Sequence, residues 1–149
     1  MDHDSAEFFS EANASDSPRP APAAPVVVSV CISCKAADTG AVVGPAMFDA
    51  VSVALSGGDA AVMVRPVQCL SVCKRPATVA VTSPDGYTFL FGDLQTDSGS
   101  AALLSFVQSY QTSDYGLVPW RERAEVLRKG MIARVPPLRW SPQDGRAPK

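Results

Sequence analysis

Hydrophobic residues along this chain fall into short runs that have either a strand or a helix period. The run PVVVSVCI, at residues 25–32, is rich in β-branched residues and apolar on both faces, which is typical of a buried central strand. The run GPAMFDAVSVALSGG, at residues 44–58, has its apolar residues at helical spacing. Proline at the first helical position and glycines after the end mark its boundaries, so we expect a helix of about three turns.

Three more strands and a second helix follow. Residues 60–69, AAVMVRPVQC, predict a second buried strand. Residues 77–81 and 87–91 flank the turn sequence SPDG, and strands joined so tightly must be antiparallel. Residues 97–111, DSGSAALLSFVQSYQ, offer capping residues before an apolar helical face. The order of elements is therefore β-α-β-β-β-α, which predicts an α/β fold.

The expected topology brings the cysteines together. The chain has four cysteines, in the pattern Cys31-x2-Cys34-x34-Cys69-x3-Cys73. The first pair ends one predicted strand and the second pair follows the next. A helical crossover makes these strands parallel, and the carboxyl ends of parallel strands emerge at one edge of the sheet. We expect both cysteine pairs at that edge.

Four converging thiolates suit tetrahedral zinc or an iron–sulfur cluster. The halves differ in spacing, C-x2-C against C-x3-C, and a 2Fe–2S cluster tolerates this irregularity better than zinc does. A dithiol oxidoreductase using Cys31 and Cys34 is a third possibility. In that class the motif opens the next helix, whereas here roughly ten residues separate Cys34 from Pro45.

Charge divides the chain into three parts. Residues 1–25 hold five acids and one arginine and end in SDSPRPAPAAP, which predicts a disordered N-terminal arm. Residues 26–112 form the predicted metal-binding domain. Residues 113–149 are basic and form a C-terminal extension that we expect to pack on this domain.

The C-terminal extension allows two interpretations. It can be a packing segment, with a short helix at about residues 121–129 and apolar residues that cover the sheet: Trp120, Met131, Ile132 and Val135. It can also be a basic surface that binds an acidic protein or an anionic ligand, built on Arg121, Arg123, Arg128, Lys129 and Arg134. Bases are too few, and stacking aromatics too scarce, to predict nucleic-acid binding.

Location and partners follow from what the chain lacks in its sequence. Its first fifteen residues are acidic, without the basic start or apolar run of a secretory signal, and no run reaches the roughly 18–20 apolar residues that span a bilayer. We therefore expect a cytoplasmic protein without a membrane partner, in a compartment that keeps thiols reduced. The sequence leaves the oligomeric state open, including a homodimer.

The run KRPATVAVTSPDGYTFLFGDL, after Cys73, resembles the third and fourth strands of thioredoxin-like 2Fe–2S ferredoxins, and the cysteine pattern resembles theirs too. The chain is also similar to small bacterial proteins described only as predicted metal-binding, whose genes often neighbour cobalamin-synthesis genes. The resemblance covers about residues 26–138. It implies a single thioredoxin-like domain.

The same resemblance implies a function. Cys31 and Cys34 would ligate one iron, and Cys69 and Cys73 the other. The protein would be an electron carrier and not an enzyme, passing single electrons to or from a redox partner protein. Lys74 and Arg75 would offset the cluster's negative charge. The alternative is a structural or metallochaperone protein that binds zinc through all four cysteines.

Overall fold

The computed structural model describes residues 25–57 and 61–138 of the 149-residue chain. The predicted N-terminal arm lies outside the described residues except for Pro25, and so do residues 139–149 of the predicted C-terminal extension. No helix in the described ranges is long and apolar enough to cross a membrane.

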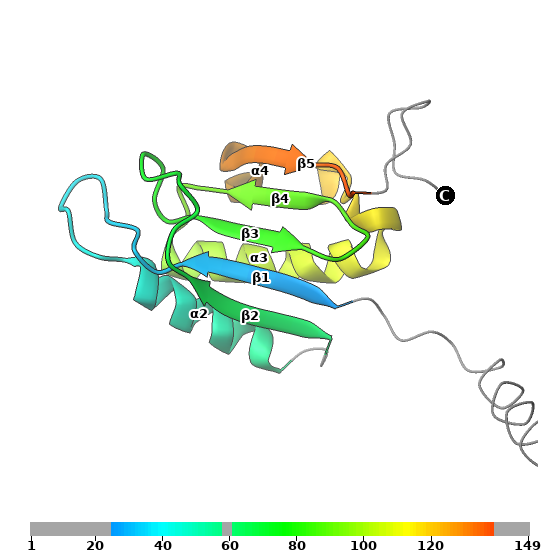
Figure 1. Ribbon diagram of the computed structural model, residues 1–149, viewed down its shortest axis with the longest axis horizontal. Coiled ribbons are helices and arrows are strands. Elements are labelled where there is room, and N and C mark those ends of the chain that lie inside the picture. Colours follow the sequence, from blue (N-terminus) through cyan, green and yellow to red (C-terminus); the bar gives the residue numbers. More distant parts are fainter. Residues whose placement is uncertain (1–24, 58–60, 139–149) are drawn as a thin grey trace, which may run out of the picture.

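One mixed α/β domain is built on a five-stranded sheet with the strand order β2-β1-β3-β4-β5 (Figure 1). The elements of the sheet and its two long helices are β1 (Val26–Cys31), α2 (Gly44–Ser56), β2 (Val62–Val67), β3 (Val79–Thr82), β4 (Thr88–Phe91) and α3 (Thr96–Thr112). These six elements reproduce the predicted order. The C-terminal part adds η1 (Asp114–Gly116), η2 (Trp120–Glu122), α4 (Glu125–Lys129) and β5 (Met131–Val135).

Strand β1 is buried inside the sheet, as its two apolar faces predicted. It pairs parallel with β2, with Cys31 opposite Val67, and antiparallel with β3, with Val30 opposite Val79. Both valines of this last pair are fully buried. The parallel β1–β2 pair is the predicted crossover unit, with α2 as its connection.

Strand β2 differs from its prediction. It lies at the edge of the sheet and is only half-buried, with Met63 57% exposed. The interpretation of residues 60–69 as a second buried strand was therefore wrong. Pro66 was the sequence signal, because proline cannot donate a ladder hydrogen bond and is confined largely to edge strands.

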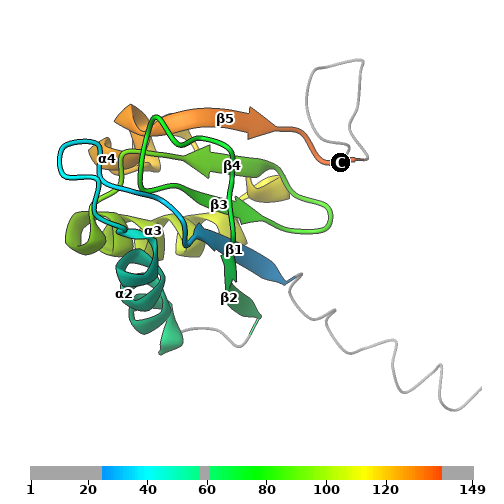
Figure 2. The same ribbon diagram turned by 60° about the vertical axis from the view of Figure 1, so that its left-hand side comes forward.

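Helices α2 and α3 pack side by side on one face of the sheet (Figure 2). The core beneath α3 is aromatic. The ring of Phe106 lies 5.0 Å from that of Phe89 and 5.0 Å from that of Phe91, edge to face in both cases. Edge-to-face contacts of this kind stabilise a core beyond the area they bury. Phe89 and Phe91 of β4 therefore face inward and belong to the core.

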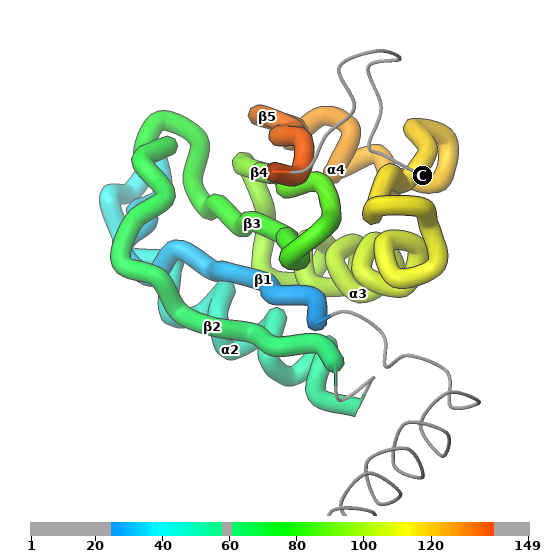
Figure 3. Tube along the Cα trace, turned by 45° about the vertical axis from the view of Figure 1, so that its right-hand side comes forward, coloured from blue at the N-terminus to red at the C-terminus, as the bar shows by residue number. Residues whose placement is uncertain are grey.

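The segment after α3 returns to the sheet and lies beside α3 and β4 (Figure 3). Strand β5 pairs antiparallel with β4 and becomes the second edge of the sheet, with Phe89 opposite Arg134. Leu127 of α4 is fully buried. The sequence predicted a short helix here but not a strand, so Met131 and Ile132 extend the sheet where we expected them to cover it.

Candidate metal centre

The cysteine loops begin where the two parallel strands end. Strand β1 ends at Cys31 and β2 at Val67, and the Ile32 amide donates a hydrogen bond to the Val67 carbonyl at 2.9 Å. The Cys31 amide donates to the carbonyl of Thr78 at 3.1 Å. Both loops therefore lie side by side at one end of the sheet (Figures 1 and 3).

Helix α2 holds the first loop through its opening residues. The amides of Val43 and Gly44 donate to the Cys34 carbonyl, at 2.8 and 3.3 Å. The backbone approach is very close: a β-carbon on Gly44 would lie 2.4 Å from the carbonyl carbon of Ile32 and 2.5 Å from the carbonyl oxygen of Cys31. Only glycine fits this contact between helix and cysteine loop.

All four cysteines line one cavity of about 340 Å³. The topology predicted this meeting of two cysteine pairs that have 34 residues between them in sequence. The other lining residues are Ser33, Lys35, Val72 and Thr78. No cysteine is in a disulfide, so four sulfur donors are available on this cavity. Such a set favours zinc, copper(I) or an iron–sulfur cluster over hard cations.

The first pair is buried and hydrogen-bonded. Cys31 is 3% exposed and Cys34 is 5% exposed. The Cys34 sulfur lies 3.4 Å from the Thr78 hydroxyl, and the Cys31 sulfur lies 3.6 Å from the Ser33 hydroxyl. Ser33 itself donates a hydrogen bond to the Gln68 carbonyl, which links the first cysteine loop to the second.

The two buried thiols differ in acidity. Burial on its own would raise the pKa of Cys31, but hydrogen bonds from Ser33, from Cys34 and from the backbone at Ser33 and Leu70 outweigh it and lower the pKa to about 7. Burial raises the pKa of Cys34 above its ordinary value, and the neighbouring Cys31 adds to that rise. Cys31 is therefore the more acidic of the two thiols and ionises first, near neutral pH.

The second pair is exposed. The amide of Ser71, between the two cysteines, donates a hydrogen bond to the Cys69 sulfur at 3.1 Å. Ser71 has φ of 62°, a left-handed conformation that turns this amide back toward the sulfur. Amide donors of this kind stabilise thiolate charge and, in iron–sulfur proteins, help to set the potential.

The donor set fits a metal centre in chemistry and in location but does not form one as it stands. Across residues 25–57 and 61–138, no three side chains of His, Cys, Asp or Glu are arranged to hold a metal ion. The ligand role of Cys31, Cys34, Cys69 and Cys73 therefore stays a prediction. It is supported by one shared cavity and by hydrogen-bond donors around the sulfurs.

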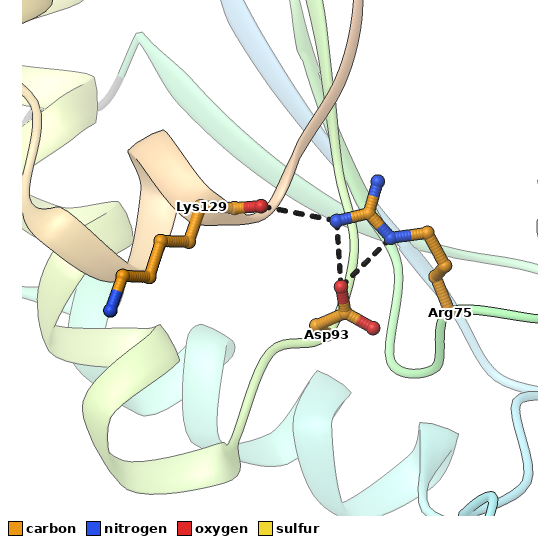
Figure 4. Close-up of polar contacts among 3 residues, drawn as sticks. All are labelled: Arg75, Asp93 and Lys129. Carbon is orange, nitrogen blue, oxygen red and sulfur yellow. Dashed lines mark hydrogen bonds and ion pairs between the residues drawn. The ribbon is translucent and has the colours of Figure 1, made fainter.

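Arg75 is not available to offset cluster charge in the cavity, as we had expected it to be. Its guanidinium pairs with the Asp93 carboxylate at 2.7 Å and donates to the carbonyl of Lys129 at 3.1 Å (Figure 4). Asp93 neutralises its charge, and the contact joins the second cysteine loop to the end of α4. Arg75 is a structural link. Lys74 is exposed, and its role in offsetting cluster charge stays a prediction.

Two site residues were missed by the sequence analysis. Thr78 is fully buried and contacts Cys34, and Ser33 bridges the two loops. The sequence did carry a signal for Ser33, because this serine lies between the two cysteines of the C-x2-C motif. Thr78 carried no such signal, because its contact depends on the antiparallel pairing of β1 with β3.

The geometry can be set beside known proteins. A family model described as "Protein of unknown function (DUF1636)" matches residues 28–137. The chain belongs to this family. The match includes all four cysteines and runs from within β1 to just beyond β5. A comparison with curated proteins found no match.

A comparison with solved structures bears on the fold of this DUF1636 member. The chain is similar to the thioredoxin-like [2Fe-2S] ferredoxin from Aquifex aeolicus, with a TM-score of 0.51 and 15% identity. The alignment covers 75% of this chain and 94% of the ferredoxin. The predicted thioredoxin-like fold is thereby confirmed.

Proposed function

We propose that this DUF1636 protein is a small electron carrier with a 2Fe–2S cluster bound by Cys31, Cys34, Cys69 and Cys73. The observation that carries the proposal is the single cavity lined by all four cysteines. The thioredoxin-like fold supports it, because a ferredoxin of this fold places a cluster on a domain of similar size. The proposal includes no catalytic residue and therefore no enzymatic activity of its own.

A bound 2Fe–2S cluster would accept one electron and release it again without other chemical change. The chain's residues would do the rest. Cys31 and Cys34 would hold the buried side, where Thr78 and Ser33 orient their sulfurs. Cys69 and Cys73 would hold the exposed side, which a redox partner can approach. Lys74, exposed beside Cys73, would favour an acidic partner surface. The chain resembles small bacterial proteins whose genes often neighbour cobalamin-synthesis genes, which suggests where to look for this partner.

Anaerobic purification of the full chain tests the proposal. We expect brown protein with about two iron ions and two acid-labile sulfides per chain, and an electron paramagnetic resonance signal after one-electron reduction. Cys31→Ser and Cys73→Ser should each lose most of this iron. Ser105→Ala, at an exposed residue of α3 that does not line the cavity, keeps all four thiols and should retain it. Colourless protein with about one zinc per chain would instead support the zinc alternative.

One observation favours a second candidate, a dithiol oxidoreductase. The pKa of Cys31 is lowered to about 7, and the neighbouring Cys34 is one cause of this shift. A reactive thiolate requires both acidity and access, however, and Cys31 is only 3% exposed. Reduction of insulin by metal-free protein, retained in Cys73→Ser and lost in Cys31→Ser, would establish this candidate over the electron carrier.

A further inference from the structure

A second and larger cavity, of about 980 Å³, is lined by residues of the segment after α3 and of strand β5. It contains no cysteine and belongs to no part of the proposed electron-transfer site. Its volume is at the upper end of the range for small-molecule sites.

The floor of this cavity holds a buried cation. Arg123 is 7% exposed, and its Nε and Nη2 atoms both donate to the Val118 carbonyl, at 3.0 and 2.8 Å. Its guanidinium carbon lies 5.1 Å from the centre of the Phe89 ring and 5.5 Å from that of Trp120. Two aromatic rings and one carbonyl thus fix this guanidinium in place.

A second cation lines the same cavity from β5. The Arg134 guanidinium lies 5.3 Å from the centre of the Tyr87 ring and is exposed. Neither Arg123 nor Arg134 forms an ion pair anywhere in the described chain. Asp114 also lines the cavity but is paired with neither. Burial lowers the pKa of Arg123, and the nearby charge of Arg134 lowers it further, as expected for cations without a counterion.

Apart from Ser113 and Asp114, the remaining wall is largely apolar. Leu117, Val118 and Met131 line it, and Trp120 stands at the cavity 55% exposed, although large aromatic side chains are usually more deeply buried. An apolar wall with an exposed aromatic ring and two uncompensated guanidinium groups matches a ligand that has a flat apolar body and an oxyanion.

We propose that this cavity binds a small organic anion, with its planar body against Trp120 and its carboxylate, phosphate or sulfonate group at Arg134. Arg123, which the Val118 carbonyl holds in place, contributes a fixed positive charge beside the ligand. A small molecule fits better than a peptide because the space is a cavity of limited volume next to two closely placed cations.

Two fluorescent probes of one shape test the site. 8-Anilinonaphthalene-1-sulfonate carries an aromatic body with a sulfonate, and N-phenyl-1-naphthylamine carries the same body without charge. Full-length protein should bind the sulfonate saturably, one per chain, and more tightly than the neutral probe. Arg134→Gln should weaken binding of the sulfonate about tenfold, the effect of one charge-assisted hydrogen bond, and leave the neutral probe unchanged. Trp120→Ala should weaken both.

Arg121→Gln is the matched control, because Arg121 is exposed on the same segment but does not line the cavity. It should bind both probes like the unmodified chain. Far-UV circular dichroism and thermal melting of each variant separate loss of binding from loss of folding. Equal affinity for the two probes, non-saturable binding, or an equal effect of Arg134→Gln and Arg121→Gln would overturn the proposal. Equal binding before and after removal of bound metal would show that the site is independent of the cysteines, as proposed.

Discussion

The sulfur of Cys34 lies 3.4 Å from the hydroxyl of Thr78, although the two residues are 44 positions apart in the chain. Thr78 immediately precedes β3, and its carbonyl accepts the amide of Cys31 at 3.1 Å. The start of β3 therefore positions both cysteines of the first pair. The buried half of the candidate metal centre depends on this strand as much as on β1.

Removal of the Thr78 hydroxyl should loosen the first cysteine loop. Thr78→Val keeps the side-chain shape but leaves the buried Cys34 thiol without this partner, which should cost about 1 kcal/mol of the free energy of unfolding. Denaturant unfolding of metal-free, reduced protein measures the change. Thr96→Val, at an exposed residue, is the control. An unchanged midpoint in Thr78→Val would mean that this contact contributes nothing to stability.

The first cysteine pair should release one proton near neutral pH. Because hydrogen bonds lower the pKa of Cys31 from 9.0 to about 7, thiolate absorbance at 240 nm should rise in one step near pH 7, with the Cys34 thiol ionising above its ordinary range. Cys31→Ser should remove the lower step. Between pH 7 and 9 the unfolded chain binds more protons at this thiol than the folded chain, so stability should increase with pH in that window. A first step above pH 8.5 would contradict the assignment.

Gly44 should be indispensable for the geometry of the first loop. In Gly44→Ala the new β-carbon would meet backbone atoms of Cys31 and Ile32 at 2.4–2.5 Å, so the loop or the helix must move. We expect a loss of about 1–3 kcal/mol in stability, typical of overpacking, and reduced metal content after purification. Unfolding curves and metal analysis report the two effects.

Gly57→Ala is the matched control for this substitution. Gly57 follows the other end of α2, has φ of −86°, and a β-carbon there would meet nothing within 4 Å. The free energy of unfolding of Gly57→Ala should differ from that of the unmodified chain by no more than about 0.5 kcal/mol, in either direction. Equal losses in both variants would show that the contact between Gly44 and the cysteine loop is not special.

The link between Arg75 and Asp93 should stabilise the fold modestly. Both side chains are partly exposed, at 36% and 52%, so solvent weakens their ion pair, but Arg75 also donates to the Lys129 carbonyl. Arg75→Ala should lower the free energy of unfolding by roughly 1 kcal/mol, and less at high salt. Lys74→Ala, at the exposed neighbouring position, should leave it unchanged. The same result for both variants would argue against a structural role for Arg75.

Local patterns were sufficient to predict most of the fold. The β-branched run at β1 and the helical spacing in α2 and α3 are properties of short segments, and each segment adopts the structure that its own period favours. The meeting of the cysteine pairs was also predictable. A helical crossover makes the two strands parallel, and the carboxyl ends of parallel strands emerge at the same edge of the sheet. The four cysteines accordingly line one cavity.

Contacts between distant segments required the tertiary structure. An apolar run does not show whether its strand has one neighbour or two, and this is why β2 was expected inside the sheet and lies at its edge. Residues 131–135 became a strand because β4 offered them an unpaired edge, which no local pattern in the sequence records. The partners of Cys34 and Arg75, and the cavity that Arg123 and Arg134 share, arise in the same way: each joins side chains that only the assembled sheet brings within reach.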